Sequence, residues 1–456
     1  MRPVRFGTDG VRGLANVELT AELALSLGRA TARVLRAESF IAGRDTRLSG
    51  PLLQAAFCAG LASEGAKVCD VGVLPTPALA MLAQRRGVPA AVVSASHNPF
   101  FDNGIKLFDA AGAKLAQETE LAIERELASI TSRDRAPNQR DGARPSHRGV
   151  GIVVEDVRAQ DEYRHGVVRA LQGRRLDGLH VVLDCANGAA SRVAPAIFES
   201  VGARVEALFD QPDGTNINDG CGSTHPGPLA AAVESRAAAL GLAFDGDADR
   251  LVAVDHRGAV LDGDALIALF ALDLERRGML PGPAVVVTVM SNLGLKAALA
   301  KRQIATLQTP VGDRAVLEAL EAGGLHLGGE QSGHIVFRHL ATTGDGILTA
   351  LLLADLVMRS GLGLAALASG IIERVPQLLR SVAVLEPQRL GEAAEVWKAV
   401  EVAERAVGAQ GRVLLRASGT EAVVRVMVET QDEAVAARIM ESLTEVVQDV
   451  LGRPPA

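Results

Sequence analysis

One pattern of apolar and polar positions occurs three times along the chain. In each copy an apolar run predicts a buried strand, a helix-like run and a second strand follow, and a third apolar run leads into a polar loop. The three polar loops are SASHNP from Ser94, DGDADR from Asp245 and GGEQSGH from Gly328. Strands that alternate with helices predict α/β sheets covered by helices, so we interpret the three segments as copies of one unit.

Changes in composition predict the boundaries of the units. The segment 131–148 is polar, rich in Arg and Pro and without periodicity, which is typical of a linker. Further boundaries are predicted at the turn 256–258 and in the Gly-rich segment 360–370. The chain beyond that point has strand-like runs and a long terminal helix, which predicts a smaller α+β domain. We therefore expect four domains, at residues 1–148, 149–256, 257–370 and 371–456.

Composition excludes several classes of function. The 456 residues carry a formal net charge of -7 and only 3% aromatic residues, which argues against nucleic-acid binding. The four cysteines are scattered without a CxxC pair, so we expect reduced thiols and a cytoplasmic protein. The most apolar stretches are too short and too interrupted to span a bilayer, and no membrane partner is expected.

The first polar loop contains a candidate nucleophile, Ser96. A serine in a loop rich in Asn and Pro is more often a turn former, and SASHNP does not match the GxSxG pattern. The pair Asn103-Gly104 predicts a two-residue hairpin turn that returns Lys106 toward the serine. We interpret His97 as a residue that holds the loop in position rather than as a base.

The second polar loop is a candidate metal site. The carboxylates of Asp245, Asp247 and Asp249 alternate with small residues, a spacing that brings hard oxygen donors together and suits Mg²⁺. An EF-hand is excluded because Arg250 and His256 stand where that loop requires Gly and Glu. A solvated acidic turn remains the alternative, and Mn²⁺ accepts the same ligands.

The metal loop and the serine loop together make a further prediction. Mg²⁺ prefers a few carboxylates combined with a phosphate oxygen, and the nearest candidate for attaching a phosphate covalently is the serine loop. A phosphoserine supplies about two negative charges and strong acceptor oxygens. The sequence therefore predicts a phosphorylated Ser96.

Eight motifs in order along essentially the whole chain resemble those of the α-D-phosphohexomutase family. They are FGTDGVRG, SASHNPFFDNGIK, DCANGAA, PDGTNINDGCGSTH, AFDGDADR, GGEQSGH, TTGDG and RASGTEAVVRVMVE. The resemblance implies three related α/β domains, with mixed sheets sandwiched by helices, and a smaller α+β C-terminal domain around a central cleft. RFGTDGVRG and GGEQSGH are most similar to the branch that acts on glucosamine phosphates. That branch interconverts glucosamine 6-phosphate and glucosamine 1-phosphate in the route to UDP-N-acetylglucosamine.

The resemblance also implies roles for individual residues. Ser96 is the phosphoserine, and its phosphate oxygen holds one Mg²⁺ per chain together with the three aspartates. The residues expected around the transferring phosphoryl group are Arg12, Lys106 and Arg250, with Lys106 a candidate for acid/base work. His334 either assists proton transfer or anchors its loop, and Glu330 and Ser332 read sugar hydroxyls. The expected clamp for the phosphate that does not react comprises Arg416, Ser418, Gly419, Thr420 and Arg425.

Several alternatives remain open at this level. Phosphoglucomutase or phosphomannomutase activity uses the same chemistry on another sugar, and a Mg²⁺-dependent phosphatase would admit water to the phosphoenzyme. A non-catalytic sugar-phosphate binding protein has no use for a serine beside a metal site. The expected partner is a phosphosugar, with glucosamine or glucose 1,6-bisphosphate as intermediate or activator. Both a monomer and a homodimer are compatible with the sequence.

Overall fold

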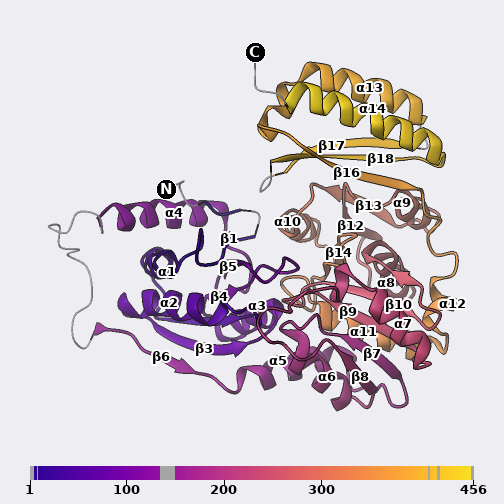
Figure 1. The fold of residues 1–456 in the computed structure, drawn as a ribbon. Coiled ribbons are helices and arrows are strands. Elements are labelled where there is room, and N and C mark those ends of the chain that lie inside the picture. Colours follow the sequence, from indigo (N-terminus) through magenta and orange to yellow (C-terminus); the bar gives the residue numbers. More distant parts are fainter. Residues whose placement is uncertain (1–4, 8, 134–148, 409–410, 419–421, 453–456) are drawn as a thin grey trace. The chain divides into compact units, whose positions relative to one another are not determined.

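The computed structural model describes residues 5–7, 9–133, 149–408, 411–418 and 422–452. The chain divides into two compact units. One comprises residues 1–290 and 306–369, and the other comprises residues 291–305 and 370–456. The first unit carries three sheets of six, five and four strands, and the second carries one sheet of three strands (Figure 1).

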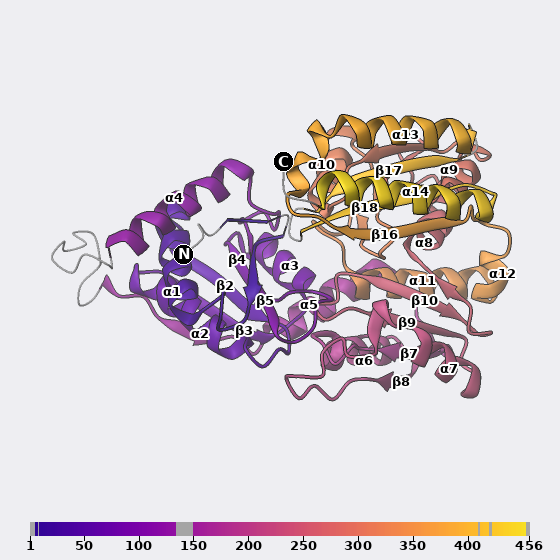
Figure 2. The same cartoon turned by 45° about the horizontal axis from the view of Figure 1, so that its top comes forward.

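The first sheet has the strand order β1-β5-β4-β2-β3-β6 and is mixed, because β1, β4 and β5 pair antiparallel and the other pairs are parallel. Phe40 and Ala42 belong to a core that includes residues of α1, α2 and α4, while α3 packs against β2 and β4. Alternation along the strand turns Ile41 toward the side of α3. Figure 2 shows the two groups of helices on opposite sides of this sheet. The elements are β1 (Val11–Leu14), α1 (Ala21–Leu35), β2 (Ser39–Arg44), α2 (Gly50–Ser63), β3 (Lys67–Val73), α3 (Thr76–Arg86), β4 (Ala90–Val93), β5 (Asp102–Phe108), α4 (Gln117–Arg133), β6 (Val153–Glu155) and α5 (Ala159–Val168).

The second and third sheets repeat the central part of the first. In each sheet a buried strand (β4, β9 or β14) lies parallel to an earlier strand and antiparallel to the strand that follows it (β5, β10 or β15). The three polar loops predicted from the sequence connect these strand pairs. The elements are β7 (His180–Asp184), α6 (Ala190–Ser200), β8 (Arg204–Leu208), α7 (Gly227–Ser235), β9 (Leu240–Phe244), β10 (Leu251–Asp255), β11 (Val260–Leu261), α8 (Gly263–Arg276), β12 (Ala284–Thr288), β13 (Ala305–Thr309), α10 (Asp313–Gly323), β14 (Leu327–Gly329), β15 (Ile335–Phe337), α11 (Gly346–Ser360) and α12 (Leu364–Ala368).

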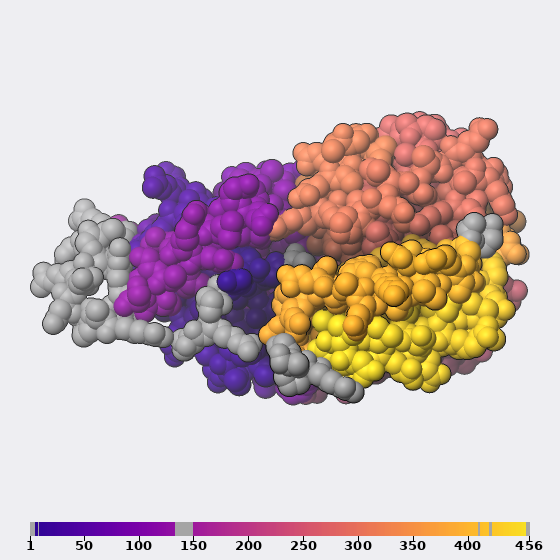
Figure 3. All heavy atoms as spheres, turned by 90° about the horizontal axis from the view of Figure 1, so that it is seen from above, coloured from indigo at the N-terminus to yellow at the C-terminus, as the bar shows by residue number. Residues whose placement is uncertain are grey.

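The second unit is an antiparallel sheet of order β16-β18-β17. Helices α13 and α14 lie side by side over one face of it (Figures 1 and 3). The elements are α9 (Leu293–Ala300), β16 (Gln377–Ala383), α13 (Ala394–Val407), β17 (Arg412–Ala417), β18 (Val423–Glu429) and α14 (Glu433–Leu451). Although α9 lies within the third repeat of the sequence, the Leu293 N–H donates to Glu429 Oε1 at 2.7 Å and Asn292 Nδ2 donates to the Val375 carbonyl at 2.8 Å. These bonds attach the start of α9 to the second unit.

Across the described part of the chain, no helix has both the length and the apolar character that a membrane crossing requires. The longest, α14, has 19 residues and includes four glutamate and aspartate side chains and one arginine.

Candidate active site

Ser96 follows β4 in a tight, buried turn. Its backbone has φ of +53°, a left-handed conformation that is uncommon for a residue with a Cβ atom. The Ser96 N–H donates to Ser94 Oγ at 3.0 Å, and the Ser96 hydroxyl donates to Asp245 Oδ2 at 2.6 Å. The first and second polar loops therefore meet at this hydroxyl, and the turn aims the serine at the aspartate cluster.

Arg47 holds the serine loop in place through its guanidinium group. It is almost completely buried and forms an ion pair with Asp45 at 2.8 Å. Its Nη2 donates to the carbonyls of Ser96 and Asn98 at 2.8 Å each, and its Nη1 donates to the carbonyls of Asp102, at 3.0 Å, and Pro99. One guanidinium thus donates to four carbonyls of the loop and holds its backbone in one conformation.

Asn218 supports the same loop from the second sheet's side of the site. Its Nδ2 donates to the Ser96 carbonyl at 2.9 Å and to the Asn98 carbonyl at 3.0 Å. The backbone of Gly246 also lies against this loop, because a Cβ atom there would be 2.6 Å from the Ser96 carbonyl oxygen. Only glycine permits so close an approach of the two loops.

The predicted hairpin turn at Asn103-Gly104 is wrong. Both residues lie inside β5, and the turn comes earlier, where the Asp102 N–H donates to the Pro99 carbonyl at 3.2 Å. The physical reason is that β1 pairs with β5, placing Gly13 opposite Asn103 and Arg12 opposite Gly104, so the strand continues through the pair. Lys106 nevertheless returns toward the serine loop as expected, because it lies on β5, the strand that follows the turn.

The three aspartates of the second loop lie together. Each offers a carboxylate oxygen within 4.8 Å of the others, and all three residues are buried. Burial, with the charges of Asp249 and Asp247, holds the pKa of Asp245 well above its ordinary value. Burial raises the pKa of Asp249 too, but the basic side chains around it, His334 foremost, outweigh burial and lower the pKa.

These carboxylates fit a hard divalent cation. Asp247 Oδ1 and Asp249 Oδ1 are buried oxygens without a hydrogen-bond partner in the described structure. Asp247 Oδ2, in contrast, accepts the Thr76 hydroxyl at 2.6 Å and lies 2.8 Å from Lys106 Nζ. Leaving buried anionic oxygens without partners is costly, and an oxygen-seeking cation such as Mg²⁺ removes that cost.

Of the three basic residues expected near the phosphoryl group, Lys106 and Arg250 lie directly beside the aspartates, and Arg12 is connected to them through Asp9. Lys106 Nζ is 2.8 Å from Asp247 Oδ2 and 3.9 Å from Asp249 Oδ2. Arg250 Nε is 3.9 Å from Asp245 Oδ2 and 3.8 Å from Asp249 Oδ1, distances of ion pairs without hydrogen bonds. Arg12 contacts Asp9, with Nη2 at 2.6 Å from Oδ2, and reaches the cluster only through that carboxylate.

Two histidines flank the hydroxyl and the cluster. His97 Nδ1 is 3.3 Å from Ser96 Oγ, and burial together with the charge of Arg250 lowers the pKa of His97 to about 4. His334 Nδ1 is 3.6 Å from Asp249 Oδ2, while the Gly344 N–H donates to His334 Nε2 at 3.2 Å. Burial lowers the pKa of His334, but the hydrogen bond to Asp249 and its charge outweigh burial and raise the pKa to about 9, so a proton on Nδ1 is directed at Asp249.

The third polar loop is joined to the second through its backbone. The Leu251 N–H donates to the Gly333 carbonyl at 3.0 Å, which fixes the loop to the start of β10. Glu330 Oε1 accepts the Gly312 N–H at 3.0 Å, and Ser332 is exposed. The loop thus places a carboxylate and a hydroxyl beside the aspartate loop.

The residues predicted as a phosphate clamp belong to the second unit. Arg416 on β17 is the register partner of Arg425 on β18, and the Ser418 N–H donates to the Val423 carbonyl at 2.9 Å. Gly419 and Thr420 lie outside the described residues. Two adjacent guanidinium groups on one sheet are a suitable site for an anion.

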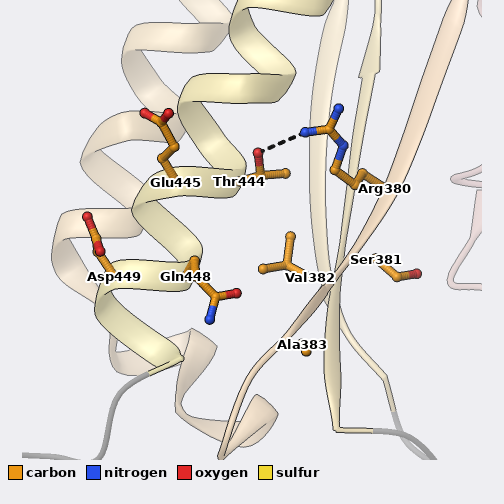
Figure 4. Close-up of a pocket in the computed structure, with 8 residues that line it drawn as sticks. All are labelled: Arg380, Ser381, Val382, Ala383, Thr444, Glu445, Gln448 and Asp449. Carbon is orange, nitrogen blue, oxygen red and sulfur yellow. Dashed lines mark hydrogen bonds between the residues drawn. The ribbon is translucent and has the colours of Figure 1, made fainter.

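A pocket also lies in the second unit, between β16 and α14 (Figure 4). Arg380 Nη1 donates to Thr444 Oγ1 at 3.3 Å across it. None of the predicted site residues lines this pocket, whose walls are Arg380, Ser381, Val382, Ala383, Thr444, Glu445, Gln448 and Asp449.

Sequence reasoning did not single out several residues that build the site: Asp9, Asp45, Arg47, Thr76 and Asn218. Each acts on the Ser96 loop or the cations and carboxylates through contacts with distant parts of the chain, such as the separation of 171 residues between Thr76 and Asp247. A weak signal existed for Asp45 and Arg47, because the polar run RDTR directly follows the apolar strand β2.

Comparison with known proteins places the chain in a family. Models for phosphoglucomutase/phosphomannomutase match along the chain: α/β/α domain I at residues 3–134, domain II at 161–258, domain III at 262–375 and the C-terminal domain at 379–446. The phosphoglucosamine mutase of Desulforudis audaxviator is 49% identical over 453 residues, which cover 98% of each chain.

Solved structures share the fold. A phosphoglucomutase/phosphomannomutase family protein from Burkholderia thailandensis has a TM-score of 0.79 at 25% identity and covers 97% of each chain. The N-acetylphosphoglucosamine mutase of Aspergillus fumigatus, solved in complex with GlcNAc-6P and magnesium, has a TM-score of 0.69 at 17% identity and covers 98% of this chain and 96% of its own. The chain belongs to the phosphoglucomutase/phosphomannomutase family, the α-D-phosphohexomutases.

Proposed function

We propose that the chain interconverts glucosamine 6-phosphate and glucosamine 1-phosphate through a phosphorylated Ser96 and a 1,6-bisphosphate intermediate. The observation that carries the proposal is the 2.6 Å contact between Ser96 Oγ and Asp245 Oδ2. It sets a hydroxyl that can be esterified within a carboxylate cluster in which two buried oxygens, Asp247 Oδ1 and Asp249 Oδ1, lack hydrogen-bond partners. The relationship to phosphoglucosamine mutases at 49% identity supports the amino sugar as substrate.

A phosphate oxygen on Ser96 and the three aspartates would hold one Mg²⁺ per chain. When bound, the ion neutralises charge on the phosphoryl oxygens and acts as a Lewis acid. The magnesium complex of the Aspergillus fumigatus enzyme, which has a similar fold, supports this choice of metal.

In the first transfer the bond between phosphorus and Ser96 Oγ breaks while a bond forms from phosphorus to the sugar 1-hydroxyl oxygen. The proton released by that hydroxyl ends on Ser96 Oγ, so the exchange balances. Burial lowers the pKa of Lys106, but the charges of Asp247 and Asp9 raise it above the ordinary range. Lys106 therefore acts as a cation that stabilises charge on the phosphoryl oxygens, together with Arg12 and Arg250.

The second transfer returns the other phosphate to Ser96 after the bisphosphate has turned over. Glu330 and Ser332 contact the sugar hydroxyls in this proposal. Arg416, Ser418 and Arg425 bind whichever phosphate is not reacting, with Gly419 and Thr420 in the same motif. The same residues serve both halves of the reaction, because the two halves differ only in which end of the sugar faces Ser96.

The four cysteines all lie in described parts of the chain and are free thiols. This supports a reducing compartment, the cytoplasm, as the site of action.

Phosphorus NMR of the purified protein with Mg²⁺ and a trace of glucose 1,6-bisphosphate tests the proposal. We expect glucosamine 6-phosphate to be converted to the 1-phosphate faster than glucose 6-phosphate is converted. Faster turnover of the glucose or mannose phosphate would favour phosphoglucomutase or phosphomannomutase activity. Release of inorganic phosphate faster than isomerisation would indicate a phosphatase.

A further inference from the structure

Asp9, just before β1, is the meeting point of three cations. Its Oδ2 lies 2.8 Å from Lys106 Nζ and 2.6 Å from Arg12 Nη2, and its Oδ1 lies 2.6 Å from Lys114 Nζ. The carboxylate is mostly buried, with 17% of its side chain exposed. Burial raises its pKa, but Lys106, Lys114 and Arg12 outweigh burial and lower the pKa well below the ordinary value. Asp9 is therefore an anion in the folded protein.

The backbone beside Asp9 is fixed to the strand that carries Lys106. Gly10 has φ of +79°, and a Cβ atom there would lie 2.3 Å from the Ile105 carbonyl oxygen and 3.0 Å from Lys106 Cα. Any other residue would push this turn away from β5. The carboxylate and the ammonium are thus held together by main chain as well as by charge.

Asp9 also differs from the other anions around Lys106. Asp247, at 2.8 Å, and Asp249, at 3.9 Å, belong to the aspartate cluster, whose negative charge a divalent cation neutralises. Asp9 is not part of that cluster. A divalent cation would offset most of the charge of the cluster and would repel Lys106 and Arg12, and Asp9 is the carboxylate outside the cluster that holds both.

We propose that Asp9 is a positioning residue for phosphoryl transfer, which gathers Lys106 and Arg12 into one cationic site facing the phosphoryl group of Ser96. The inference rests on the proposed function. One carboxylate shared by these two cations leaves a net positive charge, which suits a dianionic phosphoryl group. In the proposed function the lysine and the arginine contact the phosphoryl group, and Asp9 acts through them.

Lys114 offers a matched control. It contacts Asp9 and also forms an ion pair with Asp313, at the start of α10, and we assign it no part in the reaction. Lys114→Met should therefore keep kcat within about threefold of the wild type. It also removes one of the three cations that would lose the carboxylate of Asp9 in Asp9→Asn, so the double variant Asp9→Asn/Lys114→Met has a better prospect of folding.

The experiment compares Asp9→Asn, Asp9→Glu, Lys114→Met and the double variant for mutase kcat and KM, with circular dichroism as the test of folding. Misplacing a group near the reacting atoms by about 1 Å costs on the order of 100-fold in rate, so we expect kcat to fall by that factor in both variants that carry Asn. KM for the sugar phosphate should change by less than about threefold, and Asp9→Glu should recover at least part of kcat.

The inference is overturned if the folded double variant keeps kcat within about threefold of Lys114→Met. It is equally overturned if KM rises while kcat is unchanged in folded Asp9→Asn, or if folded Asp9→Glu is as slow as folded Asp9→Asn. A wild-type protein that does not isomerise the sugar phosphate at all would instead contradict the proposed function. The two failures are therefore distinguishable.

Discussion

The Ser96 site and the proposed phosphate clamp on β17 and β18, called the clamp below, are built in different ways. The Ser96 site joins residues far apart in sequence, with separations of 149 residues between Ser96 and Asp245 and 141 between Lys106 and Asp247. The clamp joins Arg416 and Arg425, which face each other on two consecutive antiparallel strands. The reacting groups are fixed by non-local buried polar contacts, whereas the clamp needs only one correctly registered hairpin.

This difference predicts different responses to substitution. Buried polar networks are destabilised strongly when one partner is lost, because the remaining groups stay desolvated. Arg416 and Arg425 are only half-buried, so we expect them to affect mainly the ligand that they bind. Changes at the Ser96 site should therefore reduce both the free energy of unfolding and kcat. Changes at the clamp should reduce only the affinity for the sugar phosphate.

The largest effect on stability is expected for Arg47→Met. The change leaves Asp45 buried without its cation and removes the donor to four loop carbonyls. Breaking a buried ion pair costs about 3–5 kcal/mol, so urea denaturation should show a loss of that size, with kcat reduced as well. Adding Asp45→Asn should restore part of the stability, and an unchanged unfolding midpoint in Arg47→Met would contradict the role of the network.

A pH-dependent effect is expected at Asp345. Burial raises the pKa of this carboxyl from 3.8 to about 6, although the Leu348 N–H and the Tyr163 hydroxyl lower it. Because the folded pKa is above the unfolded one, the contribution of Asp345 to stability is complete below about pH 4 and is lost as pH rises through 6.

Asp345→Asn removes this dependence while keeping an oxygen for the Leu348 N–H, which Asp345 Oδ1 accepts at 2.9 Å. Relative to the wild type, the variant should gain about 3 kcal/mol between pH 4 and pH 7, from roughly two pKa units. Denaturation curves at several pH values check this, and parallel curves for the two proteins would refute it.

Thr76→Val should weaken metal binding. The valine keeps the shape but loses the hydroxyl that holds Asp247 Oδ2 at 2.6 Å. Loss of a group that orients a metal ligand typically costs 10–100-fold in affinity, which calorimetric titration with Mg²⁺ measures. Thr76→Ser should retain the wild-type affinity, and equal affinities for all three proteins would show that Thr76 does not orient the ligand.

The smallest effect, a rise of about tenfold in KM, is expected for Arg416→Gln. Loss of one charge-assisted hydrogen bond to phosphate should raise KM by about that factor and leave stability nearly unchanged. Arg380→Gln on the same sheet, a residue bonded to Thr444, serves as the control. A large fall in stability or in kcat alone for Arg416→Gln would remove the distinction between the two sites.

Local patterns predicted the fold and the meeting of the first two polar loops. Strand, loop and antiparallel strand recur as expected, because alternation and apolar runs report burial directly. Ser96 and the three aspartates could be paired through chemistry, because Mg²⁺ prefers carboxylates together with a phosphate oxygen, although β4 and β9 belong to different sheets.

Contacts between distant segments were not predictable in the same way. Arg47 and Asn218 look like ordinary polar loop residues, and only the folded chain brings them to the Ser96 carbonyl. The wrong turn at Asn103-Gly104 has a related cause. The favourable turn pair Asn103-Gly104 did not form a turn because these residues pair with β1, where Arg12 lies opposite Gly104 although 92 positions separate the two in sequence.

Phosphopeptide mapping of the protein after incubation with glucose 1,6-bisphosphate and Mg²⁺ tests whether Ser96 carries the transferred phosphoryl group. We expect one phosphoryl group, on Ser96, that disappears when glucosamine 6-phosphate is added and is absent from Ser96→Ala. Phosphate on another residue, or an unphosphorylated Ser96 in a protein that still isomerises the sugar, would contradict it.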